Sequence, residues 1–178
     1  GNSTPYAASL TVQAAPSIIM GPALPSICTG GTTGPLGGSA SGAGLISAIW
    51  SDGTVGGTFA NNTGNSPELV TYTPPANFTG TVSLRLTATG SACNAINSKG
   101  LQVLPTGTAT WLGLTNNWAA STNWSTGAVP GACTAVIVPA VGVGPLVQGT
   151  TNRVKSITVQ QGATLTLATG AVLEVEHR

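Results

Sequence analysis

Short stretches in which apolar and polar residues alternate recur along most of the chain. The clearest spans residues 82–88, with the sequence VSLRLTA. Alternation at period two predicts a strand with its apolar side chains in a core and Arg85 in water. The predicted core positions are Val82, Leu84, Leu86 and Ala88.

From residue 17 to residue 105, such stretches are short and are separated by turn residues, which is typical of a β-sandwich of the immunoglobulin-like kind. Trp50 lies in one of these strands and is a predicted core residue. The Asp52-Gly53 pair that follows favours a two-residue type I′ hairpin. Pro74 and Pro75 mark a strand end, because proline donates no hydrogen bond to a sheet.

The predicted sandwich ends with the run Gly100–Leu104, just before Pro105, and a similar run, Ser9–Gln13, comes before Pro16. If this similarity is a repeat, residues 1–13 are the last strand of a preceding module. The alternative is that any two strands that lead into a linker proline look alike. We therefore divide the chain into a strand or linker (1–16), an Ig-like sandwich (17–105) and a second β module (106–178).

The second module ends in an eight-residue repeat. Residues 156–163 (SITVQQGA) are followed by 164–171 (TLTLATGA) and by the incomplete unit 172–175 (VLEV). Each unit has apolar residues at its second and fourth positions, and glycines occupy the turns. This pattern predicts either a tight antiparallel meander or the first coils of a β-solenoid. Because the third unit is incomplete, we expect the natural polypeptide to continue.

The composition supports an all-β fold. The chain has 25 glycines and 12 prolines, and its 41% hydrophobic residues are sufficient for a core. Five basic and four acidic residues give a net charge of +1, which favours neither nucleic acid nor anionic lipid as a partner. The longest apolar stretch, residues 135–147, is interrupted by prolines and is too short to span a membrane.

The three cysteines, Cys28, Cys93 and Cys133, lack both the spacing and the histidines of a zinc site. Cys28 and Cys93 flank the two ends of the predicted sandwich, so we expect a disulfide between them and an oxidising, extracellular setting. Cys133 would then be unpaired or joined to another chain. The alternative is that all three are small buried side chains.

Both modules resemble parts of the large extracellular proteins of Bacteroidota, including gliding-type surface adhesins exported by the type IX system. The residues that carry the resemblance are Ile27–Gly30, Trp50, Gly56–Phe59, Thr71–Pro75, Gly80–Val82, Leu86–Gly90 and Cys93, then Thr110–Trp111, Asn117–Trp118, Thr122–Ser125, Val129–Pro130, Val136–Pro139 and the run GATLTL. The resemblance implies a structural or adhesive segment on the bacterial cell surface, in a stalk, filament or adhesin. Its partners would be neighbouring modules or subunits of the same protein, with surface glycans as a further candidate.

Three tryptophans, Trp111, Trp118 and Trp124, are the strongest candidates for binding. Aromatic faces stack on sugar rings, so the cluster allows an alternative function as a carbohydrate-binding module of a secreted polysaccharide-degrading protein. We favour a place in the core, where large aromatic residues are mostly found. The few carboxylates and the single histidine, His177, assemble neither a catalytic pair nor a metal site, so we expect no enzyme activity, metal or other cofactor.

Overall fold

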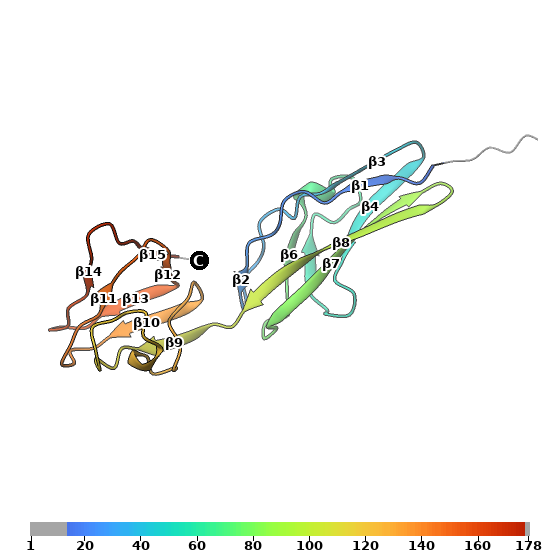
Figure 1. The fold of residues 1–178 in the computed structure, drawn as a ribbon. Helices are drawn as coiled ribbons and strands as arrows, with labels where there is room; N and C mark the ends of the chain where they lie inside the picture. Colours follow the sequence, from blue (N-terminus) through green and yellow to red (C-terminus); the bar gives the residue numbers. More distant parts are fainter. Residues whose placement is uncertain (1–13, 177–178) are drawn as a thin grey trace, which may run out of the picture. The chain divides into compact units, whose positions relative to one another are not determined.

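The computed structural model describes residues 14–176, and almost all of their regular structure is β-strand (Figure 1). This confirms the predicted all-β fold. The predicted strand Ser9–Gln13 and His177 lie outside the described residues. The first eight strands are β1 (Ser17–Ile19), β2 (Ile27–Cys28), β3 (Ser39–Ser41), β4 (Leu45–Ser51), β5 (Thr58–Ala60), β6 (Thr71–Thr73), β7 (Gly80–Gly90) and β8 (Asn94–Leu104).

Seven further strands follow: β9 (Gly107–Thr110), β10 (Thr134–Val138), β11 (Leu146–Val147), β12 (Asn152–Val154), β13 (Ser156–Val159), β14 (Thr166–Leu167) and β15 (Leu173–Val175). Two single-turn 3₁₀ helices, η1 (Pro67–Leu69) and η2 (Ser121–Asn123), complete the described elements. Residue contacts divide the chain into two compact units. Of the described residues, the first unit comprises 14–25, Thr32–Pro75 and Val82–Leu101, and the second comprises Ser26–Gly31, Ala76–Thr81 and 102–176. The predicted division at residue 105 differs from these units at three short segments, which are residues 26–31, 76–81 and 102–105.

The long strands of the first unit, β4, β7 and β8, lie in one sheet of order β2-β8-β7-β4. Two antiparallel pairs, β1 with β3 and β5 with β6, complete the unit. On β7, the four apolar side chains predicted to face the core are fully buried, and Trp50 on β4 is buried with them. These sequence predictions are confirmed, while the immunoglobulin-like arrangement of the strands stays a prediction.

The hairpin predicted at Asp52-Gly53 is wrong. Strand β4 pairs with β7, whereas β5 pairs with β6, so the turn joins two different sheets. A type I′ turn needs a positive φ at both central residues. Gly53 has one, at 68°, but among the described non-glycine residues only Asn61 does. Asp52 instead accepts hydrogen bonds from Gly57 and Tyr72.

The second unit is built from stacked parallel coils. Residues 20 or 21 positions apart pair in parallel, as Ala135 does with Ser156, Leu146 with Thr166, and Asn152 with Leu173. Strands β10, β11 and β12 thus form the three sides of one coil, and β13, β14 and β15 form the three sides of the next (Figure 1). Strand β9 adds the first side of an earlier coil. This pairing confirms the solenoid alternative and contradicts the antiparallel meander.

The eight-residue repeat corresponds to the sides of one coil. Each octad supplies one side and one corner of a single coil, so the units at 156, 164 and 172 together make one coil. Their apolar residues Ile157, Leu165 and Leu173 pack against the buried core of the unit. A three-sided coil therefore spans about 20 residues, and the last one consists of the two complete octads and the four residues 172–175.

Candidate functional site

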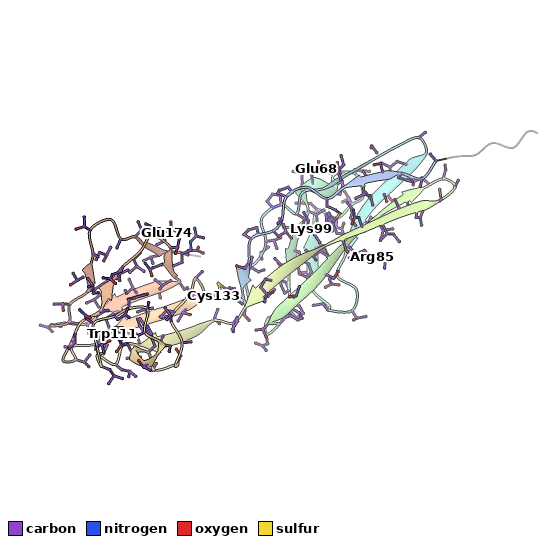
Figure 2. The ribbon with its side chains drawn as sticks, viewed as in Figure 1. Glu68, Arg85, Lys99, Trp111, Cys133 and Glu174 are labelled. Carbon is purple, nitrogen blue, oxygen red and sulfur yellow. A yellow bond between two sulfur atoms is a disulfide. The ribbon has the colours of Figure 1, made fainter. Side chains whose placement is uncertain are left out.

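The three candidate tryptophans form one cluster inside the second unit, in which Figure 2 labels Trp111. Trp111 follows β9 and pairs with Trp124 in an isolated antiparallel bridge. The Trp124 ring contacts both others edge to face, with centroids 5.0 Å from Trp111 and 4.8 Å from Trp118. This is the arrangement that aromatic quadrupoles favour. Trp124 is therefore the centre of the cluster.

Hydrogen bonds fix the orientation of the cluster. The Trp111 Nε1 donates to the Val143 carbonyl at 2.7 Å, and the Trp124 Nε1 donates to the Trp118 carbonyl at 2.9 Å. Asn123 is completely buried and holds the loop between them. Its Nδ2 donates to Thr115 Oγ1 and to the Asn117 carbonyl, and its Oδ1 accepts from the Thr115 N–H.

Burial decides between the two interpretations of this cluster. Trp111, Trp118 and Trp124 are 0%, 2% and 1% exposed, so the prediction that at least two of them are buried is confirmed. A sugar ring needs an accessible aromatic face, and these side chains offer none. The assignment of the three tryptophans as carbohydrate ligands is therefore wrong, because they fill the core of the first coil. The role of Asn123 was missed, and the only sequence signal for it was its place directly before Trp124.

The predicted disulfide is also wrong, because Cys28 is bonded to Cys133 (Figure 2). Strand β2 pairs with the end of β8, where Cys28 lies opposite Leu104. Cys93 precedes β8 and is exposed; the 11 residues of the strand separate it from Leu104, a distance of about 35 Å. The Cys133 carbonyl accepts a hydrogen bond from Gly107, only three residues beyond Leu104, which brings its side chain to Cys28.

The ammonium of Lys99 makes three hydrogen bonds within the first unit. It donates to the carbonyls of Met20, Pro22 and Leu36 and lies 5.5 Å from the centre of the Trp50 ring. Burial lowers the pKa of Lys99 below its usual value. These carbonyls are 63 to 79 residues away in sequence, so no local pattern could have predicted the contacts. The side chain joins β8 to two loops and stabilises the unit.

A second polar group of the first unit surrounds Asp52. Its Oδ2 accepts from the Gly57 N–H at 2.7 Å and from the Tyr72 hydroxyl at 2.8 Å. Burial raises the pKa of Tyr72 well above its usual range, and the hydrogen bond and the charge of Asp52 add to this. Gly57 lies flat against the Tyr72 ring, where any Cβ would collide with it.

Asp52 also borders a surface groove of about 600 Å³ between its loop and strands β7 and β8. Arg85 is the cation of this groove, and Ile96 supplies an exposed apolar surface. Asp52 is the one carboxylate among the lining residues, and its Oδ2 is already bonded to two donors. The groove therefore lacks the facing pair of carboxylates that glycoside hydrolysis generally uses.

The two acidic side chains of the second unit form ion pairs with Arg153 on the surface. Glu174 lies 2.8 Å from Arg153, its neighbour on the preceding coil, and Glu176 lies 3.6 Å from the same side chain. Within residues 14–176, no three His, Cys, Asp or Glu side chains come together as metal ligands. In the same range, no helix has the length and apolar character needed to cross a membrane.

Part of the second unit matches a protein-family model. A family model described as a domain of unknown function (DUF8693) matches residues 110–178, a range that begins within β9 and includes every later strand. No curated protein and no solved structure matches the chain. The matched range contains all three clustered tryptophans, and the family description assigns them no role.

Proposed function

We propose that this chain is a non-enzymatic structural or adhesive segment of a large bacterial cell-surface or filament protein. The resemblance of both modules to surface adhesins of Bacteroidota supports this role. The disulfide is compatible with an extracellular setting. The large aromatic side chains of the second unit are used for packing, which suits a building segment.

The main observation behind the proposal is the disulfide between Cys28 and Cys133. It joins residues 105 positions apart, so a force applied to the two chain ends passes from Cys28 directly to Cys133. Residues 29–132, which include strands β3 to β9, lie outside this covalent path. Tension can therefore not extend them while the bond is intact. A segment that transmits load benefits from such a link, because most of its length is protected from stretching.

The test is to hold the full chain by its two ends and measure the length released on unfolding, with and without a reductant. Reduction frees the 104 residues between the cysteines, which at about 3.4 Å per residue adds about 350 Å. The double variant Cys28→Ser, Cys133→Ser is the matched control and should release the longer length without reductant. An oxidised wild-type chain that already releases the longer length would contradict the proposal.

A further inference from the structure

In the last described coil of the second unit, each strand has one edge that pairs with no described strand. Strands β13, β14 and β15 pair with β10, β11 and β12 on one edge, and within residues 14–176 no strand pairs with their other edge. Such an edge presents unpaired N–H and C=O groups to any strand that can align with it. We call this surface, formed by β13, β14 and β15, the end face.

The end face is also apolar. Val159, Leu167 and Val175 are in register with Val138, Val147 and Val154 on the preceding coil, so their side chains point the same way, into the solenoid. The preceding three side chains are 0% exposed because another coil covers them. The last three are 42%, 47% and 36% exposed. Within residues 14–176, no further coil covers these three side chains.

The charge of Glu174 indicates which side chain a partner of the end face should carry. Arg153 and Glu174 are in register on the outer surface of neighbouring coils and pair at 2.8 Å, so a basic side chain on one coil meets an acidic side chain on the next. The Glu174 side chain remains 49% exposed. A basic side chain in the same place on a following layer would continue this ladder.

We infer that the end face binds a further β-solenoid coil. This partner is a segment of about 20 residues with three short strands parallel to β13, β14 and β15, apolar side chains at alternate positions and a basic residue opposite Glu174. The coil that already covers β10, β11 and β12 shows that this shape fits. The inference deepens the proposed structural role and rests on it, since it names the neighbour to which the segment binds.

A second copy of the chain, joined through the same face, fits less well. Such a symmetric contact places the same surface patch on both sides. Residues 156–176 contain Glu174 and Glu176 but neither lysine nor arginine, so the two faces would bring acidic coils together. The strands would also pair antiparallel, unlike the stacked coils of this unit.

The test is to extend the full chain after Arg178 with a second copy of residues 156–176 that carries Glu174→Lys. Tethering keeps the added coil at a high local concentration. We expect the backbone amides of β13, β14 and β15 to exchange with solvent about tenfold or more slowly than in the unextended chain. An extension that retains Glu174 should protect them less. Equal protection by both extensions would overturn the charge requirement.

Two controls make the result specific. An extension with Ile157→Asn, Leu165→Asn and Leu173→Asn has the same length and should give no protection. In the native part of the extended chain, Val159→Asn with Leu167→Asn and Val175→Asn should abolish protection. The matched triple variant Leu112→Asn, Leu114→Asn, Val143→Asn alters residues outside the end face that are at least as exposed on average, and it should not.

The extension that carries Glu174→Lys, without the asparagine substitutions, should protect the three strands. If it does not, the inference is overturned. Concentration-dependent dimerisation of the native chain, lost in the end-face variant, would overturn it in favour of a second copy. Neither result involves the disulfide or an applied force. The outcome of the force experiment, and with it the proposed function, would therefore stand separately.

Discussion

The two units bury aromatic side chains in different ways. In the first unit, Trp50 and Tyr72 are each held by a polar group from a distant part of the chain, Lys99 and Asp52 respectively. In the second unit, three tryptophans pack on one another, and repeated aliphatic side chains stack above each other from coil to coil. The first core thus depends on particular long-range partners, whereas the second depends on repetition of one pattern.

The largest expected effect tests the aromatic cluster. Trp124→Ala should lower the free energy of unfolding of the second unit by about 3–5 kcal/mol, at the upper end because two edge-to-face contacts are lost as well. Trp50→Ala, which removes a buried tryptophan with no tryptophan neighbour in contact, is the matched variant and should cost less. Denaturant unfolding combined with amide exchange would assign each loss to its unit. A greater loss for Trp50→Ala would contradict the comparison.

The next effect tests the three hydrogen bonds of the Lys99 ammonium, which we call the Lys99 clamp. Lys99→Met keeps most of the side-chain length but leaves the carbonyls of Met20, Pro22 and Leu36 without this donor, which should cost about 1–3 kcal/mol. Lys155→Met is the control, because the ammonium of Lys155 makes no hydrogen bond or ion pair within the described residues. Chemical denaturation of both variants measures the difference. Equal stabilities would show that the clamp contributes nothing.

The smallest effect depends on pH and concerns Tyr72. Its pKa is raised in the folded state, so the folded chain holds this proton more tightly than the unfolded chain, whose tyrosines ionise near pH 10. The resulting stabilisation is fully present below that pH and is lost as the pH rises above it. Tyr72→Phe should cost about 1 kcal/mol at pH 8 through the lost hydrogen bond.

A comparison of the wild-type chain with Tyr72→Phe across pH tests the pKa shift more directly than the stability at pH 8 alone. The stability of the wild-type chain should fall more steeply above pH 10 than that of Tyr72→Phe, because only the wild type carries the shifted group. Denaturant unfolding at several pH values between 8 and 11 measures both slopes. Parallel curves would mean that Tyr72 ionises equally easily in the folded and the unfolded chain.

Local patterns in the sequence predicted local structure well. Alternation in residues 82–88 identified the inward side of β7, and the character of the tryptophans predicted their burial. The parallel pairing of the last module was one of two predicted alternatives. All three depend on residues that are close in sequence or on the chemistry of single side chains.

Contacts between distant residues were the ones that the sequence did not reveal. The disulfide was assigned to Cys93 because Cys93 flanks the sandwich, but the pairing of β2 with the far end of β8 decides which cysteine is within reach of Cys28. The clamp of Lys99 depends on loops more than 60 residues away. The number of sides in one coil was also not predicted, because a pattern of eight residues does not show how many sides complete a turn.

The bond between Cys28 and Cys133 also changes the consequence of proteolysis. A protease that cuts a single peptide bond anywhere from residue 29 to residue 132 produces two pieces that remain joined through sulfur. Most of the loops of the first unit lie in this range. A nicked molecule therefore stays in one piece, and a surface built from such chains would keep its connection after damage that separates an ordinary polypeptide.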